Sequence, residues 1–226
     1  MVSSSYSNSK NMLIYSNIAY LFPLSILLYK ILYKKHFSKP IGFELAILYC
    51  AVMFFSSKYH MCRSNIAEKD GDVIQYQSDL PESHKKQICP VGEGMYLDKA
   101  TLLDHVFAFY ALTATMLYLI PMKSEVRHLI MTIVLIYIII LQSHNKIYND
   151  NMITSIPTLI ITCYFMYYII HNKTNQSNYY FVVLGGILSL IAVILFMAVP
   201  EPYWLNHSLW HILGAISGGL LLFPKY

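Results

Sequence analysis

The chain has 226 residues, of which 56% are hydrophobic and only 12% are charged. Several apolar runs approach the length that crosses a bilayer, which predicts a polytopic membrane protein with no soluble domain of useful size. The net charge of +4 is small and dispersed, so the composition argues against nucleic acid as a partner.

The first apolar run, about residues 12–33, follows a polar, serine-rich amino terminus and shows no pattern of a cleavable signal peptide. A second run covers residues 41–62. Lysines crowd the connection between the two runs, at Lys30, Lys34, Lys35 and Lys39. Because basic loops stay preferentially in the cytoplasm, this connection is predicted to be cytoplasmic and the amino terminus to lie outside.

A long polar segment, residues 63–99, follows the second run and is predicted to be an extracellular loop. Cys62 and Cys89 flank its first part, and on the oxidising side of a membrane we expect them to form a disulfide rather than to stay as free thiols. Five further runs would place the carboxyl terminus in the cytoplasm. The predicted fold is therefore a single all-α domain, residues 1–226, forming a seven-transmembrane helix bundle. Its seven spans are residues 12–33, 41–62, 100–122, 126–142, 152–170, 179–199 and 203–223.

The last two spans each carry a patch of small residues, of the kind that lets membrane helices approach closely. The patches are Gly185, Gly186 and Ser189 on one span, and Gly214, Ser217, Gly218 and Gly219 on the other. They are expected to serve helix packing, either within one bundle or between two. A homo-oligomer is therefore left open.

The last span also carries His207 and His211, which lie one helical turn apart on the same face. Ionisable groups at membrane depth are expensive and by default indicate a functional site. The predicted topology brings His60 and Asp104 to the same outer level, within roughly 4 to 14 Å of the boundary at about 1.5 Å of rise per residue. Four polar side chains at one depth together indicate a common site, which none of them would indicate alone.

Three histidines with one open position are the ligand set of a catalytic zinc site, so His60, His207 and His211 are predicted to bind Zn²⁺. Asp104 is expected to act as a base beside the metal in preference to serving as a fourth ligand. Ser56, one turn deeper than His60, can hydrogen-bond a water or a substrate oxygen. The alternative is a polar network that holds the helices together without a metal. His105 points about 100° away from Asp104 and is expected to be an interfacial histidine.

These residues resemble the signature of the CREST superfamily of seven-span hydrolases and relatives, which includes alkaline ceramidases and adiponectin receptors. The similarity covers residues 12–224 and lies in FFSSKYHMC, in Leu103-Asp104 and in the H-S-L-W-H motif of residues 207–211. That motif, with LLLFP near the end, is most similar to the transmembrane-protein-8 branch. The resemblance implies a zinc ion held by the three histidines, with Asp104 and Ser56 beside it.

Within that branch, the resemblance implies a multi-pass plasma-membrane protein that promotes the fusion of myoblasts in muscle development, with zinc in the outer half of the bundle. The alternative is a zinc-dependent lipid hydrolase, either a ceramidase-like amidase or a phospholipase-like esterase, so enzymatic activity is left open. A receptor for a lipid or hormone is a third, weaker hypothesis. Membrane lipids are the expected partners, and a fusion partner protein on the membrane is left open.

Overall fold

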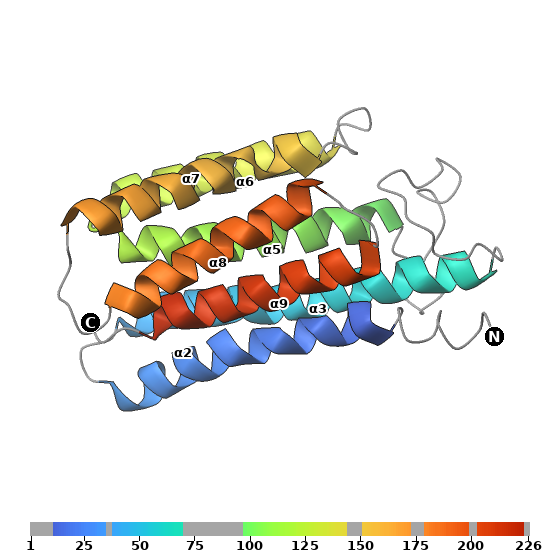
Figure 1. Cartoon of the computed structure of the whole chain (residues 1–226), viewed down its shortest axis with the longest axis horizontal. Coiled ribbons are helices and arrows are strands. Elements are labelled where there is room, and N and C mark those ends of the chain that lie inside the picture. The colour runs from blue at the N-terminus through green and yellow to red at the C-terminus, as the bar shows by residue number, and fades with distance from the viewer. Residues whose placement is uncertain are drawn as a thin grey trace.

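The computed structural model describes residues 11–34, 38–69, 97–143, 151–172, 179–198 and 203–223. Across these ranges the chain forms helices and no strand, which confirms the all-α prediction. Seven long helical segments run along one axis of the molecule (Figure 1). The elements are η1 (Ser16–Tyr20), α2 (Leu21–Tyr33), α3 (Lys39–Lys69), α5 (Leu97–Leu119), α6 (Ser124–Ser143), α7 (Asn151–Asn172), α8 (Tyr179–Ala198) and α9 (Tyr203–Leu222). The 3₁₀ turn η1 and α2 belong to one apolar helix, Asn11–Tyr33.

Five of these helices are long and apolar enough to cross a membrane, which indicates a membrane protein. They are Asn11–Tyr33, Lys39–Arg63, Lys99–Leu119, Ser124–Leu141 and Tyr179–Met197. The apolar part of α7, Ser155–His171, is shorter. The helix α9 does not reach the same apolarity among the described residues, because its first half carries Asn206, His207 and His211.

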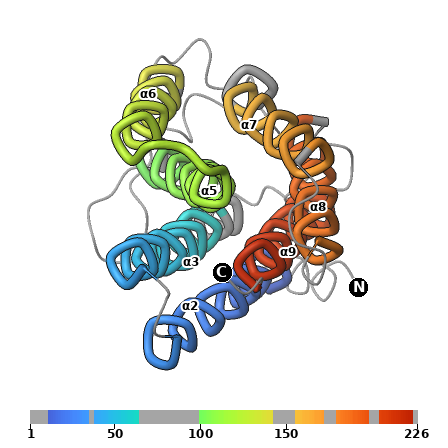
Figure 2. The backbone as a smooth tube through the Cα atoms, turned by 90° about the vertical axis from the view of Figure 1, so that its left-hand side faces the viewer, coloured from blue at the N-terminus to red at the C-terminus, as the bar shows by residue number. Residues whose placement is uncertain are grey.

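Seen along their axes, the helices form two curved rows (Figure 2). The rows are in contact through α9 and also through α5 and α7. One row contains α2, α3, α5 and α6, and the other contains α7, α8 and α9. The helix α9 packs against α8, α2 and η1, and α5 packs against α3, α6, α7 and α9. In α5, 67% of the apolar stretch is buried, compared with 17% in α6. The helix α5 is therefore interior to the bundle, whereas α6 turns most of its surface outward.

The helix ends lie within a few residues of the predicted span ends, with one exception. The predicted loop over residues 63–99 begins inside α3, which continues to Lys69, and ends inside α5, which starts at Leu97. The apolar parts of these two helices are Lys39–Arg63 and Lys99–Leu119, so the polar ends of α3 and α5 extend into the segment predicted as a loop. Polarity at residues 63–69 indicates where the apolar surface stops, but Ala, Glu, Lys and Arg are good helix formers and the helix continues. Residues 70–96 lie outside the described residues.

Cys62, near the end of the apolar part of α3, is disulfide-bonded, as the sequence predicts. Cys89, its expected partner, lies outside the described residues. Cys50 and Cys163 are free thiols at exposed positions. Because protein disulfides persist mainly in oxidising compartments, this bond bears on which end of the bundle faces outward.

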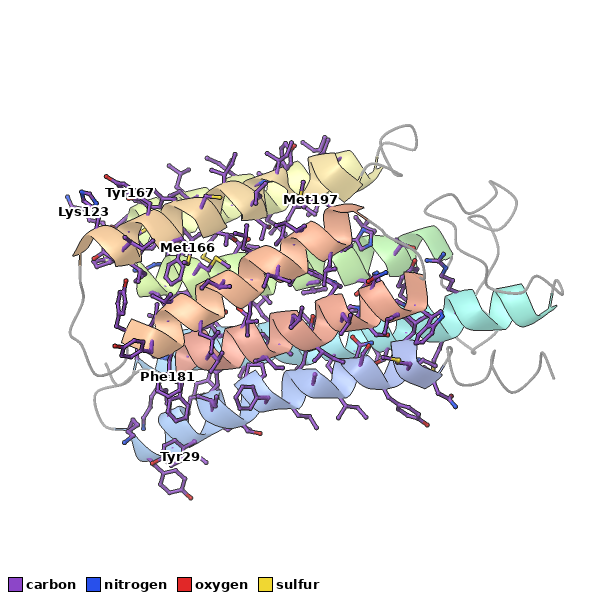
Figure 3. The ribbon with its side chains drawn as sticks, viewed as in Figure 1. Tyr29, Lys123, Met166, Tyr167, Phe181 and Met197 are labelled. Atoms are coloured by element: carbon purple, nitrogen blue, oxygen red, sulfur yellow. The ribbon has the colours of Figure 1, made fainter. Side chains whose placement is uncertain are left out.

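Part of each small-residue patch lies at the contact between α8 and α9. The hydroxyl groups of Ser189 and Ser217 are hydrogen-bonded to each other, and Ser217 Oγ donates to the Gly185 carbonyl oxygen at 2.8 Å. Gly186 of α8 faces α7 instead, where it lies against Met166, a residue labelled in Figure 3. The patches therefore pack helices of one chain, which is the first of the two alternatives that the sequence leaves open.

Gly218 of α9 allows a test of a different close contact, because it lies against Tyr49 of α3. A Cβ atom there would overlap the Tyr49 hydroxyl and lie 3.0 Å from Cζ, and that hydroxyl is held by Thr115 Oγ1 at 2.9 Å. We expect Gly218→Ala to lower the free energy of unfolding by about 1–3 kcal/mol, measured as thermal stability in detergent. Gly214→Ala is the control, since its nearest contact would be an ordinary 3.8 Å. Equal melting temperatures for the two variants would contradict this account of the interface.

Candidate metal centre

Three helices bring the predicted site residues to one end of the bundle. Ser56 and His60 lie one turn apart on α3, Asp104 lies near the start of α5, and His207 and His211 lie in the first half of α9. The carboxyl end of α3 and the amino ends of α5 and α9 meet at the right-hand end in Figure 1. Because α5 packs against both α3 and α9, these polar faces are turned toward a common interior point.

The four potential ligands converge closely. One ligand atom from each of His60, Asp104, His207 and His211 can be chosen so that all lie within 4.8 Å of one another, and all four side chains are buried. The imidazole rings of His60 and His207 have centroids 4.8 Å apart, and those of His207 and His211 are 4.7 Å apart. Burying imidazoles costs free energy unless their nitrogen atoms have partners, which a shared ligand or a shared proton would supply.

One distance in this cluster matches the separation of two zinc ligands. The Nε2 atoms of His60 and His211 lie 3.2 Å apart. Zinc holds imidazole nitrogen at about 2.0–2.1 Å in a tetrahedral arrangement, which separates two such ligands by about 3.3 Å. In addition, His60 Nδ1 and Asp104 Oδ1 are buried without a hydrogen-bond partner among the described residues. Since buried polar atoms are nearly always paired, a network of protein hydrogen bonds alone leaves this cluster incompletely satisfied.

Ser56 connects the histidines to the carboxyl group. Its Oγ lies 3.3 Å from His211 Nε2 and also hydrogen-bonds the Asp104 side chain. The side chain of Ser56 is fully buried, so this hydroxyl is committed to the cluster. The structure thus places Ser56 and Asp104 beside the three predicted ligands, and Asp104 is close enough to serve either as a base or as a fourth ligand.

Three further side chains at or next to the site were not anticipated from the sequence. The hydroxyl of Tyr20, on η1, lies 3.3 Å from His211 Nδ1. Its only sequence signal is a small group of polar residues, Ser16 and Asn17, just before it in an otherwise apolar span. Arg63 donates from Nη1 to the Tyr59 hydroxyl at 3.0 Å. The Tyr59 ring in turn packs against His60, with centroids 4.8 Å apart.

His105 is buried, which corrects its expected interfacial position. Its ring meets Phe196 edge to face at a centroid distance of 5.2 Å, and Phe109 and Tyr59 lie nearby. As the 100° rotation from Asp104 predicts, His105 stays outside the group of potential ligands. It is buried rather than interfacial because α3 and α8 both pass this part of α5, a feature that depends on tertiary packing.

The fold and the cluster together define the class: a helical membrane protein with a buried three-histidine, one-carboxylate centre at one end of its bundle. Residues 84–212, more than half of the chain, match the model of the family described as protein of unknown function, DUF3522. The chain belongs to this family. The matched region contains Asp104, His207 and His211, whereas Ser56 and His60 precede it. No curated protein matches the chain at a significant level.

Proposed function

We propose that the chain is a seven-transmembrane protein of the plasma membrane that binds zinc and acts on membrane lipids. In this proposal α7 and α9 cross the bilayer beside the five more apolar helices. The 20 residues of α9 give a length of about 30 Å, which is the thickness of a hydrocarbon core. Its polar first half is turned into the bundle, as intramembrane ionisable residues generally are.

The proposed orientation has the amino terminus outside and the carboxyl terminus in the cytoplasm. Two observations support it. Lys123 lies at the same end of the bundle as Tyr29, the neighbour of Lys30 (Figure 3). The amino ends of α5 and α9, which carry Asp104, His207 and His211, lie at the opposite end (Figure 1). Cys62, which is disulfide-bonded, lies two residues after His60 and therefore near the cluster. Basic residues favour the cytoplasmic side and disulfides the oxidising side, so the metal centre would lie in the outer half.

The activity that the geometry supports best is zinc-dependent lipid hydrolysis. The observation that carries it is the convergence of three buried imidazoles and a carboxyl group within 4.8 Å. His60, His207 and His211 would hold the metal, which supplies Lewis acidity and activates water. Asp104 would accept a proton, and Ser56 would orient the reacting oxygen through its hydroxyl.

The position of the centre indicates a lipid as the substrate. His207 and His211 lie about 6 and 12 Å from the start of α9, which is just inside the apolar part of the bundle. The amide of a ceramide or the ester of a phospholipid lies near the boundary between headgroups and acyl chains. We therefore expect a lipid amide or ester, rather than a soluble compound, to reach the centre.

The test is lipid hydrolysis by the purified protein in vesicles that contain either ceramide or phosphatidylcholine. We expect free fatty acid to appear together with sphingoid base or lysophospholipid, to stop after chelation and to return with Zn²⁺. Mg²⁺ should not restore it, because Mg²⁺ prefers oxygen ligands to imidazole. Zinc-loaded, folded protein that releases no product from either lipid would refute the hydrolase proposal.

Cell–cell fusion of the myomaker type is the second candidate function. It is favoured by the H-S-L-W-H motif that begins four residues into α9. In this case zinc organises the outer half of the bundle, and activity comes from contacts with lipids, a second copy or a partner protein. Expression in non-fusing cells tests it. Fusion that persists in Asp104→Asn and disappears in His207→Ala would favour fusion without hydrolysis.

A further inference from the structure

Tyr20 reaches from the first apolar helix to a proposed metal ligand on the last helix. Its hydroxyl lies 3.3 Å from His211 Nδ1, and the two rings meet edge to face with centroids 6.0 Å apart and an interplanar angle of 76°. Both side chains are buried. The roles assigned so far to the cluster do not use Tyr20.

The two nitrogens of His211 face different groups. Nε2 lies 3.2 Å from His60 Nε2 and 3.3 Å from Ser56 Oγ, so it points to the centre of the cluster. Nδ1 points away from the centre to Tyr20. A neutral imidazole that binds a metal through Nε2 carries its proton on Nδ1. In that state His211 Nδ1–H donates to the Tyr20 oxygen, whereas the opposite tautomer would place a proton where the metal binds.

The direction of Tyr20 depends on the 3₁₀ turn η1, Ser16–Tyr20. A 3₁₀ helix turns about 20° more per residue than an α-helix, which amounts to roughly 100° over five residues. Two buried polar side chains accompany this turn: Ser16 Oγ and Asn17 Nδ2 both donate to the Leu13 carbonyl oxygen, at 2.9 and 3.2 Å. The direction of Tyr20 relative to residues 11–15 therefore differs by roughly this angle from its direction in a regular α-helix.

We infer that Tyr20 is a positioning residue for the metal centre, whose hydroxyl accepts the hydrogen bond from His211 Nδ1 and so holds Nε2 toward the metal. This inference rests on the proposed zinc site and extends it to the first span. Both η1 and Tyr20 lie outside residues 84–212, the region that matches the family model. The centre would thus require the amino-terminal helix for ligand orientation as well as for packing.

If Tyr20 had a purely structural role, loss of its hydroxyl would affect zinc affinity no more than loss of another buried tyrosine hydroxyl. Tyr49 provides this matched control. Tyr49 is also buried, and its ring lies 6.2 Å from that of Tyr20. Its hydroxyl bonds to Thr115 Oγ1 at 2.9 Å rather than to a site residue. Loss of either hydroxyl removes one buried hydrogen bond, but only the change at Tyr20 alters the surroundings of a ligand.

The experiment compares the zinc affinity of the wild type, Tyr20→Phe and Tyr49→Phe by competition with a chelating dye, using purified full-length protein. Loss of a hydrogen bond to a metal-binding histidine typically weakens metal binding about 10–100-fold, and we expect this loss in Tyr20→Phe only. In the Co²⁺-loaded proteins, the visible absorption bands should shift in Tyr20→Phe and match the wild type in Tyr49→Phe.

The outcomes separate this inference from the proposed function. Equal zinc affinity and equal Co²⁺ spectra in all three proteins would overturn the role of Tyr20 and leave the metal centre standing. A folded wild type that binds no zinc would remove the centre and the inference with it. If Tyr20→Phe does not fold, Gly214→Val replaces it, because a Cβ at Gly214 lies 3.8 Å from the Tyr20 hydroxyl and a larger side chain would displace that group. Unchanged zinc affinity in folded Gly214→Val would equally overturn the inference.

Discussion

Replacing His207 and His211 together by alanine is expected to reduce the zinc content from about one ion per chain to below about one-tenth, because a single imidazole remains of the three. Bound metal stabilises the folded state by about 4 kcal/mol when free zinc exceeds its dissociation constant a thousandfold. The melting temperature in the presence of zinc should therefore fall along with the metal content. Elemental mass spectrometry and thermal unfolding in detergent measure the two quantities.

The control for this variant is His128→Ala/His171→Ala, since both histidines are exposed and far along the chain from the cluster. It should keep its zinc and its melting temperature. The comparison also separates the metal centre from a network without metal. In a network, chelation would leave the melting temperature of the wild type unchanged, whereas at a metal centre it would lower that temperature toward the value of the double variant. Full zinc content in the double variant would show that the assigned ligands are wrong.

The second large effect is expected for Asp104→Asn, in which the side chain keeps its size but cannot take up a proton. If Asp104 acts as the base, zinc content should stay near the wild-type level while lipid hydrolysis falls about 10²–10⁴-fold. The measurement is the initial rate of fatty acid release at saturating zinc. Loss of zinc in this variant would instead identify Asp104 as a fourth ligand.

Glu44→Gln is the matched control for the loss of a carboxylate. Glu44 lies on α3 at the other end of the bundle, where its carboxylate accepts a hydrogen bond from the Tyr118 hydroxyl. Its replacement should leave both zinc content and hydrolysis unchanged. A comparable loss of activity in both variants would indicate a general effect on stability, and Asp104 would then have no special part in the reaction.

Much of the site was predictable because helical spacing is a local property. Ser56 and His60, like His207 and His211, are four residues apart, so each pair shares a face of its helix wherever that helix packs. The low tolerance of the membrane interior for ionisable groups then made Asp104 conspicuous. Because the membrane interior excludes ionisable groups, the apolar runs also located the helices to within a few residues at nearly every end.

Other features depended on information that no local pattern contains. The end of α3 at Lys69 lies beyond its apolar stretch, so hydropathy located the end of that stretch and not the end of the helix. The helix that packs against Gly185 and Ser189 is α9, as their hydrogen bonds to Ser217 show, and no local pattern identifies it. His105 was assigned to the interface because its sequence position near the start of a span does not show that neighbouring helices cover it.

The sequence by itself therefore determined that this is a helical membrane protein and which side chains are candidates for its metal centre, because burial in an apolar medium and the helical period act through neighbouring residues. Only the tertiary structure decided that these side chains converge within 4.8 Å and that Tyr20 joins them. The physical reason is that the rotation of each helix about its axis is determined by packing between segments far apart in the chain, such as the first helix and α9. The additional rotation of the 3₁₀ turn η1 is part of this.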